Sequence, residues 1–222
     1  MQSVGFDRAT KLLSFPTNNT FSVLYTASSA DLGHPIPLRT YSGRGRSLNP
    51  TIVEATCATI ATPAFFSPVV IGPRMRQQNF VGGPWCANNP TRELLKEATN
   101  AFGKDRRVAQ ILSIGSGRPK VLAVDSLATT DNVRRLAEVI GMNCEMVAKE
   151  LSTRLFSADA YLRLNVDRGM ESVQIDDWNG LGVIEGHTNA YLETTAVAEA
   201  LEASLRRLYG RVGTLTLGQI ST

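Results

Sequence analysis

The sequence predicts an α/β domain with a largely parallel sheet, because short apolar runs typical of buried strands alternate with segments of helical periodicity. The length of 222 residues is enough for one sizeable hydrophobic core. Hydrophobic residues make up 43% of the chain and charged residues 19%, which is typical of a globular protein and excludes a disordered one.

The first two predicted strands lie between residues 21 and 41. The run Phe21 to Ser28, FSVLYTAS, is apolar and partly β-branched, so it predicts a buried strand. Pro35 and Pro37 are expected to break the chain, and Leu38 to Tyr41 then forms a second short strand. The glycine- and arginine-containing segment 42–48 is predicted as a loop.

Two helix starts carry an asparagine followed by a proline, at 49–50 and at 89–90. Asparagine caps helix N-termini, and proline suits the first helical position because the N–H of that residue has no helical partner. The helices that follow are TIVEATCATIA, which Pro63 ends, and TRELLKEATNAF, which stops at Gly103.

The second half of the chain predicts two strands and two helices. The apolar run Val108 to Ile114 is closed by a glycine turn at 115–117, and residues 160–166 form the other strand. Apolar residues at helical spacing predict an amphipathic helix within 130–156 and a further helix over 188–209.

The glycine turn at 115–117, in ILSIGSGRPK, is compared with phosphate-binding loops, whose backbone N–H groups bind anions. It lacks the third glycine of a dinucleotide fingerprint and the lysine-serine pair of a P-loop. A tight turn after a buried strand is the favoured interpretation.

The sequence offers few catalytic combinations among its two histidines and three cysteines. His34 is expected in a proline-flanked loop. Cys86 and His187 are considered as a nucleophile and its base, but the favoured interpretation is that the histidines have no catalytic role. Two histidines are too few for a metal site, and the spacing of Cys57, Cys86 and Cys144 matches no zinc pattern. We therefore expect neither a metal nor a cofactor.

Carboxylates and serines add no catalytic group. Asp176 and Asp177 are adjacent and point apart, so a cap or turn role is expected for one of them beside Trp178. No Gly-x-Ser-x-Gly pattern, the nucleophile elbow of serine hydrolases, occurs anywhere in the sequence.

Charge and cysteine usage indicate the location and partners of the chain. The net charge of +3 is too small for a nucleic-acid footprint and permits weak attraction to a lipid or membrane surface. The first residues, MQSVGFDRATKLLSF, have no apolar signal core, and no window approaches the roughly 18 apolar residues of a membrane span. Unpaired cysteines indicate a reducing compartment, so a cytoplasmic location is expected.

Seven segments, in their order and spacing, resemble the fungal patatin-like phospholipase family over about residues 21–193. They are LRTYS at 38–42, NPTIVEATCATIATPAFFSPVVIG at 49–72, FVGGPWCANNP at 80–90, ILSIGSG at 111–117, YLRLNVDRG at 161–169, DDWN at 176–179 and TNAYL at 188–192.

The resemblance implies a three-layer α/β/α fold and descent from an acyl hydrolase of membrane lipids. In that family a serine at the elbow attacks the acyl carbonyl, an aspartate in a later loop takes its proton, and a glycine-rich loop holds the oxyanion. The chain is then a lead-in over 1–20 and a partial patatin-like domain over 21–222, with the elbow and oxyanion loop expected upstream of Met1.

The family's aspartate position falls on Gly82, which has no side chain to accept a proton. Pro84 replaces a small residue of the motif, Cys57 stands where the family has an arginine, and neither Glu54 nor Glu93 is expected to replace the base. The loop and cap positions that match the family motif are Gly82, Gly83, Asn88, Asn89 and Pro90.

These departures predict a patatin-like lipid acyl hydrolase relative, linked to lipid metabolism, that is catalytically incompetent alone because nucleophile and base are both missing. Two alternatives stay open. The first is a non-catalytic module that binds a protein or a lipid surface. The second is a split or truncated hydrolase completed by an upstream segment. Missing N-terminal elements would also expose a sheet edge to a protein partner.

Overall fold

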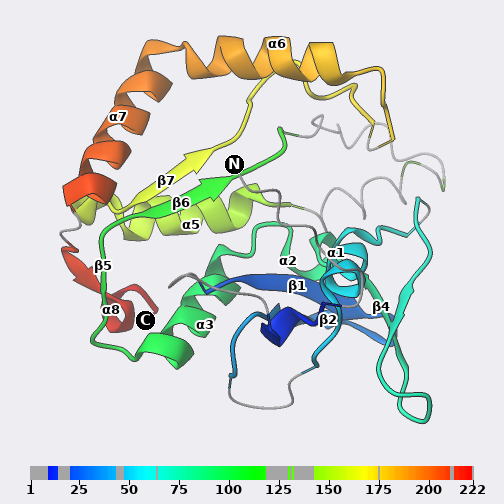
Figure 1. The fold of residues 1–222 in the computed structure, drawn as a ribbon. Helices are drawn as coiled ribbons and strands as arrows, with labels where there is room; N and C mark the ends of the chain where they lie inside the picture. Colours follow the sequence, from blue (N-terminus) through cyan, green and yellow to red (C-terminus); the bar gives the residue numbers. More distant parts are fainter. Residues whose placement is uncertain are drawn as a thin grey trace. The chain divides into compact units, whose positions relative to one another are not determined.

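The chain is a mixed α/β protein that divides into two compact units, Met1–Leu94 (unit 1) and Leu95–Thr222 (unit 2). Figure 1 shows the elements of each unit along the chain. The computed structural model describes residues 10–14, 21–43, 48–63, 65–118, 130, 132, 143–174, 176–210 and 213–221.

Unit 1 contains a four-stranded antiparallel sheet in the order β2-β1-β4-β3. Strands β1 (Val23–Ser28) and β2 (Asp31–Arg39) form one hairpin, and β3 (Val69–Ile71) and β4 (Gln78–Gly82) form another. Strands joined by such short turns run antiparallel, because a parallel pair needs a crossover of about a dozen residues or more. The prediction of a largely parallel sheet is therefore wrong for this sheet.

The second strand is longer than the sequence predicts, because β2 passes through Pro35 and Pro37. Pro35 faces Ala27 and Pro37 faces Tyr25 across the pairing with β1. Since β2 is at the edge of the sheet, the proline nitrogens, which have no hydrogen to donate, are tolerated there. The predicted break at these prolines is wrong, and so is the expectation that His34 lies in a loop.

Helix α1 (Ile52–Ile60) begins at a capping box. Thr51 Oγ1 accepts from Glu54 N at 3.1 Å, and Glu54 Oε2 accepts from Thr51 N at 2.6 Å. This reciprocal pair satisfies two backbone donors, so Thr51 takes the cap position predicted for Asn49, whose Oδ1 instead accepts from Leu13 N. The buried core of unit 1 is Leu12, Leu38, Ala55, Ala58, Ile71 and Phe80.

Unit 2 contains two short sheets. Strands β6 (Ile111–Ile114) and β7 (Tyr161–Leu164) form a parallel pair, while β5 (Arg107–Val108) pairs antiparallel with β8 (Leu215–Thr216). The run predicted as one strand from Val108 to Ile114 is thus shared between two sheets. Among the described strands, β6 and β7 are the parallel pair, so the expected parallel sheet is confined to them.

Helix α5 (Glu145–Arg154) lies along β6 and β7, as Figure 1 shows, and confirms the last part of the helix predicted within 130–156. Residues 131 and 133–142 of that prediction lie outside the described part of the chain. The buried core of unit 2 is Leu95, Ile111, Leu151, Leu155, Leu217 and Ile220.

The helix predicted over 188–209 is two helices, α6 (Leu181–Leu192) and α7 (Thr195–Gly210). At the junction Thr194 Oγ1 donates to the Ala190 carbonyl, while the Thr194 carbonyl accepts from the first turn of α7. Threonine competes with the helix in this way through its hydroxyl. The remaining elements are η1 (Leu12–Ser14), α2 (Pro84–Ala87), α3 (Thr91–Phe102), η3 (Phe156–Ala158) and α8 (Leu217–Ser221).

Among the helices that the structure describes, none has both the length and the apolar character of a membrane span.

Candidate functional site

The loop from Phe80 to Pro90 connects the sheet of unit 1 to a helix. Strand β4 ends at Gly82, and Gly83 then begins the one-turn helix α2, with Pro84 in its first turn. Asn88 closes α2, and α3 follows from Thr91. The positions predicted from the family motif therefore lie on one continuous strand–turn–helix segment.

The backbone of Gly82 and Gly83 lies against the end of α1. Gly82 N donates to the Ala61 carbonyl at 2.8 Å, and Gly83 N donates to the Thr59 carbonyl at 3.4 Å. Gly82 also pairs with Thr26 of β1. The glycine loop is thus hydrogen-bonded on the α1 side and paired with β1.

Neither glycine has free space for a side chain. A Cβ on Gly82 would lie 3.2 Å from the Thr59 carbonyl oxygen and 3.3 Å from Thr62 N. A Cβ on Gly83 would lie 2.5 Å from the Tyr25 carbonyl oxygen, closer than real Cβ atoms approach. Gly83 has an ordinary right-handed conformation, φ −61°, so the close approach of β1 and not the dihedral angle requires glycine there.

Two threonine hydroxyls hold the backbone around these glycines, and the sequence analysis missed both. Thr26 is fully buried, and its one hydroxyl hydrogen is directed at two carbonyls, with Oγ1 2.6 Å from the Val81 oxygen and 3.2 Å from the Ala58 oxygen. Thr59 Oγ1 donates to the Tyr25 carbonyl. A hydroxyl inside the apolar run FSVLYTAS was the available signal for Thr26, because a buried polar group requires a partner.

Asn89 and Pro90 start helix α3 as their sequence predicts. Asn89 is buried, and its Oδ1 accepts from Thr91 Oγ1 at 2.6 Å and from Thr91 N at 3.3 Å. Leu94 N donates to the Pro90 carbonyl, the first hydrogen bond of α3, so Pro90 directly precedes the helix. The Asn89 side chain thus accepts from the first helical residue, and the helix ends before Gly103, whose φ is +84°.

Cys86 is the nucleophilic side chain of this loop, but its surroundings make it a poor nucleophile. Its Sγ donates to the Gly83 carbonyl at 3.3 Å. Burial raises the pKa of the Cys86 thiol, and the negative charge of Glu93 raises it further. Since the thiolate is the reactive form, a raised pKa leaves Cys86 mostly protonated near neutral pH.

The other predicted acid–base residues belong to other elements of the chain. His34 Nδ1 lies 2.9 Å from Asp31 Oδ2 on the exposed edge strand, and this hydrogen bond lowers the pKa of Asp31. His187 belongs to α6 of unit 2, where its ring packs against Gly169. Cys86 and His187 belong to different units, so neither unit contains the weighed pair.

The carboxylates of Asp177 and Glu54 have structural roles, and the Cys57 thiol lies outside the loop. Asp177 accepts from Asn179 N through its side chain, as expected of a turn residue. Glu54 caps α1, and Cys57 is exposed on the same helix. Within the described residues, no three histidine, cysteine or carboxylate side chains gather as metal ligands.

The loop therefore provides backbone packing and helix capping. Its nucleophilic side chain is Cys86, and the nearby carboxylate of Glu93 raises the pKa of that thiol and so favours its protonated, unreactive form. No protein-family model matches the sequence, and the search of curated proteins found no match.

Proposed function

We propose that this chain is a non-catalytic relative of the patatin-like acyl hydrolases, with a three-layer α/β/α ancestry, that acts by binding and not by ester hydrolysis. The landmarks of the resemblance coincide with structural junctions. NPTIVEATCATIA includes helix α1 and its capping box, FVGG ends β4, NNP starts α3 and ILSIGSG is β6 with its turn.

The packing of Gly82 carries the proposal. A proton acceptor at this position needs a side chain, and a Cβ there would press against the backbone at residues 59–62. Cys86, the thiol of the same loop, has a raised pKa and donates to a carbonyl. A serine–aspartate hydrolase needs both groups, and losing them together removes nearly all of the chemistry because they act as a unit.

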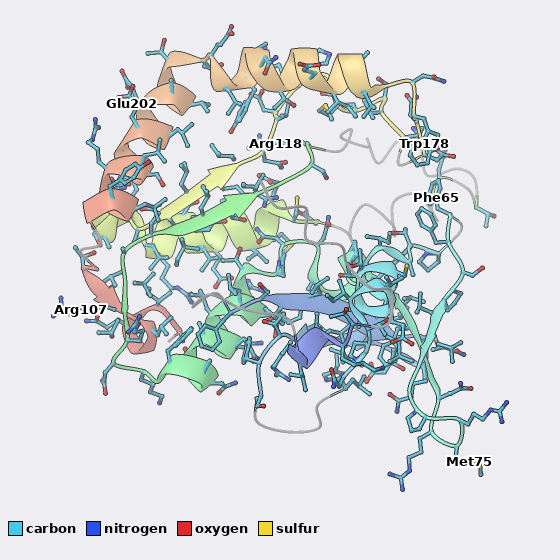
Figure 2. The ribbon with its side chains drawn as sticks, viewed as in Figure 1. Phe65, Met75, Arg107, Arg118, Trp178 and Glu202 are labelled. Carbon is cyan, nitrogen blue, oxygen red and sulfur yellow. The ribbon has the colours of Figure 1, made fainter. Side chains whose placement is uncertain are left out.

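The large apolar side chains that are exposed on both units support a role in binding. Met75 lies at the tip of the β3–β4 hairpin and is 95% exposed, and Ile114 at the end of β6 is 72% exposed. Trp178, before α6, is 83% exposed. Figure 2 shows the positions of Met75 and Trp178. Single exposed apolar side chains are common on protein surfaces, and they mark a surface that contacts a protein or a lipid where they form a contiguous patch.

An ester-hydrolysis assay tests the loss of catalysis. We expect the purified chain to hydrolyse neither p-nitrophenyl butyrate nor phosphatidylcholine vesicles above the buffer rate. Gly82→Asp should remain equally inactive, because a carboxylate without a nucleophile has nothing to activate. Cooperative unfolding followed by circular dichroism shows that the assayed protein is folded.

Hydrolysis that disappears in Cys86→Ala would contradict the proposal and identify Cys86 as a nucleophile. Cys57→Ala is the matched control, because Cys57 is an exposed thiol of the same unit outside the loop. Equal loss in both variants would indicate general damage to the protein and not a catalytic cysteine.

A further inference from the structure

A polar pocket of about 470 Å³ lies at the carboxyl end of the parallel pair β6–β7, entirely within unit 2. Ligands of α/β proteins bind in this position, outside the carboxyl ends of parallel strands. Figure 2 shows Arg118 just beyond the end of β6. The lining side chains that matter here are Arg118, Glu145, Lys149, Arg163, Asn165 and Tyr191.

Two arginines share one carboxylate in this pocket, and a lysine lines it as well. Glu145 Oε2 lies 3.3 Å from Arg118 Nη2, and Glu145 Oε1 lies 3.8 Å from Arg163 Nε. Asn165 Nδ2 also donates to Glu145 Oε1, at 2.7 Å. Lys149 adds a third cation one turn further along α5. The pocket therefore has more positive than negative charge, which favours an anionic ligand.

Arg163 is a buried donor that its neighbours do not satisfy. Its side chain is 9% exposed. Its Nη1 donates to Ser113 Oγ at 2.9 Å, but its Nε has no hydrogen-bond partner, since Glu145 Oε1 is too distant. A buried donor without an acceptor is costly and rare in folded proteins. An oxygen of a bound ligand would satisfy it.

The backbone of the glycine turn does not provide this site. Gly115 N donates to the Leu164 carbonyl, and Gly117 N donates to Asn165 Oδ1 at 2.8 Å. Arg118 N donates to the Val166 carbonyl. The turn is thus joined to β7 and its following residues, as the tight-turn interpretation expects, and an anion would be bound by side chains.

We propose that this pocket binds a phosphate group, with Arg163 as the buried donor and Arg118 and Lys149 as the charges at its opening. A guanidinium fork matches the tetrahedral oxygens of phosphate, and charge-assisted hydrogen bonds of this kind are among the strongest in proteins. The phosphate belongs either to a soluble molecule or to a phospholipid headgroup. This inference depends on unit 2 alone and not on the proposed function.

Titration calorimetry of the full chain tests the proposal with three probes, which are inorganic phosphate, glycerol 3-phosphate and phosphatidylcholine vesicles containing phosphatidic acid. We expect saturable binding of at least one phosphate probe, weakened about tenfold by Lys149→Gln and by Arg163→Lys. Lys149 is exposed, so its variant tests the pocket even if the buried Arg163 variant fails to fold. Binding of the soluble probes identifies a soluble ligand, and binding of vesicles alone identifies a headgroup.

Arg154→Gln is the matched control, because Arg154 lies on the same helix, carries the same charge and pairs with Glu150 outside the pocket. Its affinity for phosphate should equal that of the unmodified chain. The proposal is wrong if none of the probes binds saturably, or if Arg154→Gln weakens binding as much as Lys149→Gln.

Discussion

A glycine turn follows strand β4 in unit 1, and another follows strand β6 in unit 2. At Gly82 and Gly83 the space of a Cβ is taken by backbone atoms of α1 and β1. At Gly115 that space is taken by the side chains of Arg163 and Asn165. The first turn is closed by main chain, whereas the second lies beside a charged pocket.

The difference teaches that a glycine turn after a strand does not by itself indicate a binding or catalytic loop. What matters is whether backbone or side-chain atoms occupy the space in which a Cβ on the glycine would lie. Backbone atoms make the glycine a packing requirement, since they cannot move without moving an element. Polar side chains make it a neighbour of a site, because the glycine leaves room for groups that a ligand can contact.

The largest effect that would sharpen this comparison is expected from Gly83→Ala. Its Cβ would lie 2.5 Å from the Tyr25 carbonyl oxygen, so β1 or the loop must shift, and we expect a loss of about 3 kcal/mol in the free energy of unfolding. Gly82→Ala makes contacts of 3.2 to 3.3 Å and should lose about 1 kcal/mol. Urea unfolding measures both.

Gly33→Ala provides the control within unit 1, because its Cβ would meet Asp31 Oδ1 at an ordinary 3.4 Å. It should change the unfolding free energy by less than either loop variant. If Gly83→Ala were as stable as Gly33→Ala, the loop would not be held against β1 and the closed turn would be an incorrect description.

Smaller changes in stability are expected from removing a buried hydroxyl in each unit, one with hydrogen-bond partners and one without. Thr26→Val removes the hydroxyl that donates to the Val81 and Ala58 carbonyls and should lower the unfolding free energy by about 1 to 2 kcal/mol. Tyr161→Phe removes a buried hydroxyl that has no partner, so it should leave stability unchanged or raise it by up to about 1 kcal/mol. Thermal unfolding monitored by circular dichroism distinguishes the two signs, and destabilisation by Tyr161→Phe would indicate a partner for that hydroxyl.

Elements with strong local signals were predictable from the sequence. The strand beginning in the run Phe21–Ser28, the cap at Asn89-Pro90 and the strand within 160–166 agree with the structure because their signals lie within a few residues. The direction of the sheet was not predictable in the same way. It depends on which strands pair, and β4 pairs with β1 from well before it in the chain.

Competition between two valid signals explains the errors at the start of α1. Asn49-Pro50 is a typical helix start, but Thr51 with Glu54 forms a box that satisfies two donors. The candidate loop shows the same limit. The sequence located Gly82 and Gly83, yet the contact that requires glycine at position 83 comes from Tyr25, far away in the sequence. Likewise, the pocket at Arg163 is lined by residues that come before, within and after α5 in the sequence.

The smallest effect concerns the reactivity of Cys86. Because burial raises its pKa, its thiolate fraction stays low until the pH rises above the ordinary thiol range. A folded pKa above the unfolded value also means that the contribution of Cys86 to stability is present below the unfolded pKa and is lost as the pH rises through the folded pKa.

Alkylation with iodoacetamide at pH 8, followed by peptide mass spectrometry, compares the reactivity of the three thiols. The exposed Cys57 should be alkylated first, and the buried Cys144, whose pKa is also raised by burial, should react slowly. If Cys86 reacted before Cys57, the glycine loop of unit 1 would hold an activated thiol, and the contrast between a closed turn and a charged pocket would no longer separate packing from chemistry.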